Sequence, residues 1–288
     1  MRRLPKSPRL RKSKKDFLWL WRKEAMPDYK TIFERIETSL ITEGSKSLPV
    51  ERIRENLEWT KHLEQKRFTD NEYYQKLVDI IFYSGFRAAT VTEKIPVIHM
   101  HFPDYVTVVA YNSQKIDQIL ADDKMIRNRR KIEACVENAR VFQKLIRDYG
   151  SIQDFIETFS PAASLENILK LRDDLVSRFR GLGKVTAFHF LTDIGLPVLK
   201  PDRVICRIFE RLGLVENKDE LLDVVLEGRK FADATGFPIR YIDIVFVAYG
   251  QVQSREIGIE RGICLEKKPL CNLCEAQNFC LYYSKQPV

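Results

Sequence analysis

Four cysteines lie close together near the end of the printed chain, in the stretch ICLEKKPLCNLCEAQNFC. They are Cys264, Cys271, Cys274 and Cys280. Only Cys135 and Cys206 occur elsewhere among the 288 residues. Six cysteines are too few for a disulfide scaffold in a chain of this length, and clustered thiols without a secretion signal are typical of metal sites. We therefore expect the four clustered thiols to bind a metal centre.

A second candidate is the glycine turn in FRGLGKVTAFHF, residues 179–190. Gly181 and Gly183 would let the backbone turn sharply and approach a partner, and a helix is expected to begin near Lys184. The unpaired N–H groups and positive dipole end of that helix would suit a phosphate, with Arg180 and Lys184 adding charge. An ordinary connection between two helices is the alternative.

Asp202, in KPDRVICRIF, lies nineteen residues after Gly183. Following Pro201, it suits the N-cap position of a helix over 203–212. A carboxylate at a helix start also stays ionised, so it could stabilise an oxocarbenium-like sugar or activate a water molecule. The capping role and the catalytic role are compatible with each other.

The excess positive charge of the chain is confined to one segment. Residues 1–15 contain eight Lys and Arg and no acid, whereas the remainder has 40 basic and 40 acidic residues. We expect residues 1–15 to form a disordered basic tail that suits a phosphate backbone, with a solubility or targeting role as the alternative. No run of 18 apolar residues occurs, and no apolar segment directly follows the basic start. We therefore expect an intracellular protein without a membrane span, in the cytoplasm and nucleoid or, in a eukaryote, in the nucleus.

The segments that must position the cysteines, the glycine turn and Asp202 mostly show the apolar spacing of helices. Apolar residues recur at helical spacing in a segment starting at 71, in 132–149 before Gly150, in 165–180 after Ser164, and in 203–212 before Gly213. Residues 28–66 are expected to be helical with loops. The stretch RYIDIVFVAYG fits either a strand or a buried helix. The fold class is therefore all-α, with Cys135 and Cys206 on apolar, core-facing helix positions.

The hairpin, the aspartate and the four cysteines occur in an order that resembles the helix-hairpin-helix DNA glycosylase superfamily, endonuclease III type. The spacing C-x6-C-x2-C-x5-C is similar to the [4Fe–4S] signature of that family, and the resemblance spans about residues 77–280. It implies a two-lobed fold with a C-terminal iron–sulfur loop, a monomer, and double-stranded DNA with a damaged base as partner. Lys267 and Lys268 in the loop would face phosphates. Zinc is the competing metal, because C-x2-C is also a zinc element.

The resemblance also implies a domain division. We expect residues 16–76 and 196–288 to form the cluster domain, and residues 77–195 to form a helical barrel domain with the hairpin.

Part of the barrel resembles a second family, 3-methyladenine DNA glycosylase I. The resemblance rests on SGFRAATV, IRNRRKIEACVENARVF and YGSIQDFI. That family carries zinc held by Cys and His from both termini, and the N-terminal region here lacks that set, so no zinc site is carried over. The glutamate of its base pocket falls on Ser84, and the glutamate of adenine-mismatch glycosylases falls on Ile80. The target base therefore stays open.

These resemblances imply roles for further residues. Phe86 and Arg87 would fill the gap left by a flipped base, with core packing as the alternative for Phe86. The implied liners of the base pocket are Tyr83, Ser84, Phe188 and His189. Ordinary packing is an equal alternative for Phe188 and His189. Asp193 is the second-choice catalytic carboxylate, because it lies inside a helix and lacks the family spacing.

One departure from the resemblance concerns strand cleavage. Bifunctional members use a lysine directly before the Thr-Ala of the hairpin, and this chain has Val185 there, with Lys184 one place earlier. We therefore expect a monofunctional DNA glycosylase that releases a damaged base, with alkylated bases among the candidates. The alternatives are a mismatch or oxidised-base glycosylase with lyase activity through Lys184, a non-catalytic DNA-binding descendant, and a zinc-stapled interaction module.

Overall fold

The computed structural model describes residues 27–286. The expected tail over residues 1–15 and the start of the expected cluster domain at residues 16–26 lie outside the described residues. Within residues 27–286 the secondary structure is helical, and the only β feature is an isolated bridge between Ser254 and Ile259. The prediction of an all-α fold is confirmed. No helix in this range is long and apolar enough to cross a bilayer.

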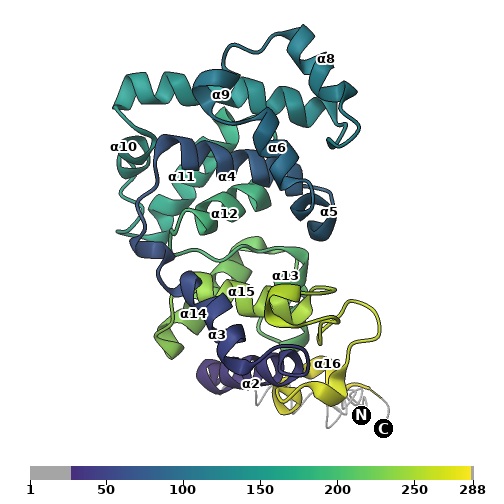
Figure 1. Cartoon of the computed structure of the whole chain (residues 1–288). Coiled ribbons are helices and arrows are strands. Elements are labelled where there is room, and N and C mark those ends of the chain that lie inside the picture. Colours follow the sequence, from purple (N-terminus) through teal and green to yellow (C-terminus); the bar gives the residue numbers. More distant parts are fainter. Residues whose placement is uncertain (1–26, 287–288) are drawn as a thin grey trace, which may run out of the picture.

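Two lobes follow from two separate hydrophobic cores (Figure 1). The first lobe, residues 63–198, is one continuous stretch of chain. The second lobe combines residues 29–58 with residues 199–284. Val225 of the second lobe joins the first core and so links the two.

The first lobe contains nine described helices. They are α4 (Asp70–Tyr83), α5 (Ala88–Thr92), α6 (Ile95–His101), α7 (Tyr105–Val108), α8 (Ser113–Ala121), α9 (Arg129–Tyr149), α10 (Ile152–Glu157), α11 (Leu165–Arg178) and α12 (Lys184–Asp193). The central helix α4 packs against α9 and α12. Its start is fixed by a reciprocal cap, in which Thr69 accepts from the Glu72 backbone and Glu72 accepts from the Thr69 backbone.

The described helices of the second lobe come from both ends of the chain. They are α2 (Tyr29–Gly44), α3 (Val50–Glu58), α13 (Arg203–Leu212), α14 (Leu221–Thr235), α15 (Ile239–Gly250) and α16 (Leu281–Ser284). Short 3-10 turns in this lobe are η3 (Arg255–Ile257), η4 (Cys271–Leu273) and η5 (Gln277–Phe279). Between the lobes, η1 (Trp59–Lys61) packs against α15, and η2 (Leu63–Gln65) begins the first lobe. Helix α15 packs against α2, α13 and α14, and the rings of Phe209, Phe231 and Phe246 meet edge to face or tilted in the core.

The stretch RYIDIVFVAYG forms most of α15, so the helical alternative is the correct one. Its β-branched residues give a weak preference for strand, but burial on several sides outweighs a propensity of a few tenths of a kcal/mol per residue. Each large apolar side chain that is fully buried contributes about 1.5–3 kcal/mol.

The division between the lobes lies earlier than the expected boundary at residues 76 and 77. That boundary would cut through α4, whose buried residues Tyr73, Tyr74 and Leu77 all belong to the first core. Leu63 and Phe68 belong to the same core, whereas Leu57 belongs to the second. The other crossing falls between Val198 and Leu199, close to the expected one at 195 and 196.

Candidate active site and cysteine centre

The glycine turn joins α11 to α12 as a tight helix-hairpin-helix. Gly181 has φ +89°, a conformation that side chains with a Cβ rarely adopt, so glycine is required there. Gly183 is the N-cap residue of α12, and its N–H donates to Thr186 Oγ1 at 2.7 Å. Asn138, buried on α9, donates to the Arg180 carbonyl and accepts from the Arg180 N–H, both at 2.9 Å. The hairpin is therefore held rigidly while both glycines stay exposed.

The two cations expected at the hairpin are placed differently. Lys184, the first residue of α12, is exposed. Arg180 is engaged by carboxylates of α9, with a short contact to Glu137 and a second to Glu133 at 3.5 Å. A phosphate at the hairpin would have to compete with those carboxylates for Arg180. The first-turn N–H groups of α12, beside Lys184, have no acceptor within the helix.

Asp202 caps α13 with one oxygen and pairs with Lys200 through the other. Its Oδ1 accepts from the N–H groups of Val204 at 2.8 Å and Ile205 at 3.1 Å. Its Oδ2 lies 3.2 Å from Nζ of Lys200, in a pair whose side chains are 23% and 15% exposed, respectively. The predicted N-cap is confirmed, and the oxygen that takes no part in the cap is paired with Lys200.

Lys200 is anchored to the second lobe through its backbone. Its N–H donates to Oδ1 of Asp243 at 3.0 Å, and Asp243 is completely buried in α15. Oδ2 of Asp243 pairs with Arg240, one turn earlier, at 2.7 Å. Burial raises the pKa of Asp243, although Arg240 and Lys200 act to lower it.

The same arginine crosses to the hairpin helix. Arg240 pairs through its other terminal nitrogen with Asp193 of α12 at 2.9 Å, and Asp193 pairs with His189 at 3.2 Å. Burial acts to raise the pKa of Asp193, but Arg240 and His189 outweigh it and hold that pKa well below the usual range. Asp193, the second-choice catalytic carboxylate, is thus committed to an ion pair between the lobes.

The loop after α4 places Phe86 and Arg87 at the surface. Phe86 is 40% exposed, so it is not a core residue. Lys131 of α9 holds this loop from behind, because its Nζ donates to the carbonyls of Ile81 and Ser84 and lies 5.4 Å from the centre of the Phe86 ring. An exposed ring on a braced loop is suited to insertion between bases.

Of the four expected pocket residues, Tyr83 and His189 are neighbours, and Phe188 is buried in the core. The rings of Tyr83 and His189 lie 6.4 Å apart, and the Tyr83 hydroxyl is 3.0 Å from Oγ1 of Thr92. Phe188 is completely buried in the first core, with the Arg172 guanidinium 5.0 Å from its ring centre. Because α12 turns Phe188 toward α11, the packing alternative is the one that the structure supports for this residue. Ser84 ends α4 and is partly exposed.

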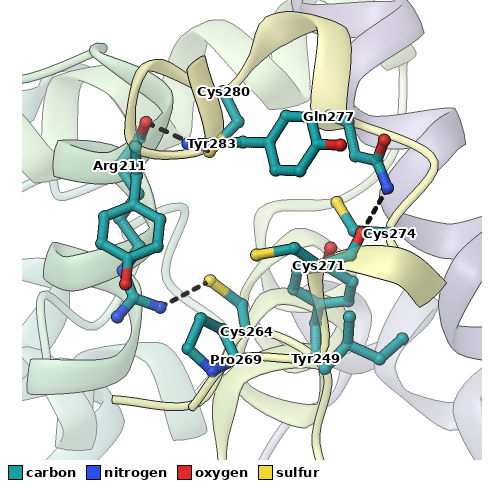
Figure 2. Close-up of a pocket in the computed structure, with 11 residues that line it drawn as sticks. Arg211, Tyr249, Cys264, Pro269, Cys271, Cys274, Gln277, Cys280 and Tyr283 are labelled. Carbon is teal, nitrogen blue, oxygen red and sulfur yellow. Dashed lines mark hydrogen bonds between the residues drawn. The ribbon is translucent and has the colours of Figure 1, made fainter. Parts of the chain in front are cut away.

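The four clustered cysteines surround one cavity between α13 and α16 (Figure 2). None of the four is in a disulfide. Cys135 and Cys206 are also free thiols, and they are buried in the cores as predicted. Arg211 of α13 donates to Sγ of Cys264 at 3.2 Å and lies over the Tyr282 ring at 4.4 Å. Lys267 and Lys268 are exposed on the intervening loop.

Four free thiols line this cavity, together with Arg211, Ile263, Pro269, Gln277 and three tyrosine rings. Thiolates are ligands that both zinc and iron–sulfur centres use. Burial raises the pKa of Cys274 to about 11, so metal binding there must displace a proton. Among residues 27–286, no group of three or more His, Cys, Asp or Glu is arranged to hold a metal ion.

Several residues of this site are absent from the sequence-based expectations. They are Lys131, Asn138, Lys200, Arg240 and Asp243. Of these, Lys200 and Asp243 had a local signal, because each is a charged residue beside an apolar run. Their pairing joins segments 43 residues apart, and no spacing rule indicates it.

Comparison with solved structures shows which fold the chain has. Endonuclease III trapped as a covalent intermediate with DNA matches with TM-score 0.53 and 17% identity, over 83% of this chain and 98% of that one. The 8-oxoguanine DNA glycosylase of Thermotoga maritima matches with TM-score 0.50 and 18% identity, over 76% and 96%. The fold is that of the helix-hairpin-helix DNA glycosylases. The 3-methyladenine DNA glycosylase I of Staphylococcus aureus also matches, with TM-score 0.42 and 23% identity, over 49% and 84%.

The sequence profile described as methyladenine glycosylase matches residues 55–198, half of the chain. The chain belongs to the methyladenine glycosylase family. It is a DNA N-glycosylase of base excision repair that acts on damaged bases.

Proposed function

We propose that this protein is a monofunctional glycosylase that hydrolyses the N-glycosidic bond of a flipped-out damaged base, with alkylated purines as the first candidates. The observation that carries the proposal is the arrangement of Asp202. Its capping oxygen is fixed by two N–H groups, and its second oxygen is held at the lobe junction beside Lys200. A carboxylate whose capping oxygen is fixed in this way keeps its position while charge develops on a nearby sugar.

The main contribution of the protein to the proposed reaction is the negative charge of Asp202. A purine alkylated on a ring nitrogen is positively charged, so it leaves with the bonding electrons as a neutral base. The sugar becomes oxocarbenium-like, Asp202 stabilises its charge, and a water molecule directed by the carboxylate adds to C1′ and loses a proton. Lys184 would act as a phosphate contact at the helix start of α12 rather than as a nucleophile.

DNA would be held by elements around this carboxylate. The exposed turn at Gly181 and Gly183 would let the DNA backbone approach the first-turn N–H groups of α12. Lys267 and Lys268 on the cysteine loop would contact phosphates through their charge. Phe86 and Arg87 would occupy the gap left by the flipped nucleotide. The flipped base would lie near Tyr83, Ser84 and His189. We also propose that the protein acts as a monomer in the compartment that holds DNA.

We propose a [4Fe–4S] cluster as the cofactor, bound by Cys264, Cys271, Cys274 and Cys280. Support comes from the C-x6-C-x2-C-x5-C spacing and from the single cavity that the four free thiols share. When bound, the cluster would supply a rigid structural centre for the loop that presents Lys267 and Lys268. Iron analysis near four atoms per chain supports this assignment, and stoichiometric zinc refutes it.

The experiment that tests the function is a panel of duplexes, each with one alkylated, oxidised or mismatched base. Released bases are identified by mass spectrometry, and strand cleavage is followed on gels. Release of alkylated bases without strand cleavage is the expected result. Release of only an oxidised or mismatched base would show that alkylated bases are not the substrate. DNA binding without release of any base would favour the alternative of a DNA-binding protein that has lost catalysis.

A further inference from the structure

The most informative group outside the roles assigned above is Lys200. Lysine is seldom buried unless it is paired, yet this side chain is only 15% exposed. Its backbone is tethered to the buried Asp243, so the side chain starts from a fixed point beside Asp202. The position is therefore set by the fold and is not an accident of a flexible surface chain.

The capping of α13 does not require this lysine. Oδ1 of Asp202 alone accepts both backbone N–H groups, and Lys200 occupies Oδ2, the oxygen that the proposed reaction needs. An ammonium ion at that oxygen would neutralise part of the charge that should stabilise a sugar cation. An efficient site would have to remove Lys200 from Asp202 before the bond breaks.

The neighbouring charges explain why Lys200 stays with Asp202 in the free protein. Arg240 is shared between Asp193 and Asp243, and Lys200 is the cation that forms an ion pair with Asp202. Burial acts to lower the pKa of Lys200, but the facing carboxylates of Asp202, Asp243 and Asp193 outweigh it and raise that pKa. Lys200 is thus a cation that can exchange one anion for another.

DNA supplies the second anion. We propose that Lys200 pairs with Asp202 in the free protein and transfers to a backbone phosphate of the flipped nucleotide in the complex, which frees Asp202 for the sugar. This exchange rests on the proposed role of Asp202. A lysine suits it, because a compact ammonium on a flexible stem can move between oxygens, whereas a guanidinium binds a carboxylate through two nitrogens.

The test is a double-mutant cycle in DNA binding, which needs no catalysis. Affinity for a duplex with a tetrahydrofuran abasic-site analogue is measured by fluorescence anisotropy over a salt series. Lys200→Met should lower the slope of log affinity against log salt by about 0.9, the value for one lost phosphate contact. Asp202→Asn should tighten binding by up to about fivefold, because Lys200 no longer has to leave a carboxylate.

The decisive comparison is between backgrounds. In Lys200→Met, the added Asp202→Asn change should give no further gain, whereas in the matched control Lys184→Met the gain should persist. A general effect of removing one negative charge would appear equally in both backgrounds. Equal gains, or a wild-type salt slope in Lys200→Met, overturn the proposal.

Two further measurements keep the test decisive. Lys200→Gln retains a hydrogen-bond donor for Asp202 without the positive charge. It replaces Lys200→Met if that variant fails to fold, and Asp202→Asn should again give no gain in affinity in this background. A borohydride-trapped DNA adduct that disappears in Lys200→Gln would show that this amine is a nucleophile, and would overturn the proposal. The proposed function fails separately, if Asp202→Asn still releases the base at the wild-type rate.

Discussion

The sharpest prediction concerns Asp202, whose two oxygens have separable tasks. In Asp202→Asn the amide oxygen can still accept from Val204 and Ile205, and asparagine is as good an N-cap as aspartate. The pair with Lys200 is lost, and because its side chains are only 23% and 15% exposed, this costs more than a surface pair but less than a fully buried one. We therefore expect the free energy of unfolding to fall by about 1–3 kcal/mol.

The effect on the reaction should be larger. Removing a preorganised group that stabilises transition-state charge typically lowers the rate by about 10²–10³-fold, or about 3–4 kcal/mol. Asp202→Asn should therefore lose at least that much in single-turnover base release while still binding DNA. Asp202→Ser should behave in the same way, because serine also caps helices. Asp202→Ala should lose the cap as well and be destabilised by about 1 kcal/mol more.

The assay is single-turnover release of the identified lesion base, with urea unfolding measured on the same preparations. Asp28→Asn is the matched control, because Asp28 caps α2 in the same lobe by accepting from the Thr31 N–H at 3.0 Å. It should keep the wild-type rate and stability. If Asp202→Asn keeps the full single-turnover rate, the catalytic assignment of Asp202 is wrong.

Other predictions address the lobe junction, the cysteine centre and the hairpin. Arg240→Met removes the guanidinium that Asp193 and Asp243 share and should lower the free energy of unfolding, measured in urea, by about 3–5 kcal/mol. A loss below about 1 kcal/mol would contradict a buried ion pair. Burial acts to raise the pKa of Asp193, but Arg240 lowers it more strongly. The stabilisation that ionised Asp193 gives to the folded protein is therefore complete above about pH 4 and decreases below it. Asp193→Asn should therefore be less stable than wild type at pH 7 and converge with it in acid, as calorimetry at several pH values would show. Cys274→Ser should lose iron and visible absorption, and unchanged iron content would remove this thiol from the ligand set. Lys184→Ala should weaken DNA binding, and neither it nor the wild type should give a borohydride-trapped adduct.

Much of the helical framework could be predicted because its signals are local. Apolar spacing with Thr69, Ser164 or Asp202 at helix starts, and Gly150 or Gly213 at helix ends, depends on nearby residues alone. The hairpin and the cysteine loop are also short segments, so their spacing was sufficient to locate them.

The rest depends on how distant segments meet. Phe188 and His189 are adjacent in the sequence and both follow the hairpin, yet one is in the core and the other faces the lobe junction. Only the packing of α12 against α11 and α4 decides which side each occupies. Likewise, the role of Arg240 requires carboxylates from two different lobes, and no local pattern could indicate it.

The discontinuous second lobe has a consequence for how this chain folds. Helix α2 packs against α14 and α15, which follow it by well over a hundred residues, whereas the first lobe is built from one continuous stretch. Contacts between segments that are far apart in the sequence form slowly. We therefore expect the first lobe to fold early during synthesis, and α2 to pack only after α14 and α15 have been made. The cysteines come later still, because all four follow α15. Insertion of the proposed cluster would then be among the last events of maturation, on a chain whose glycine hairpin is already folded.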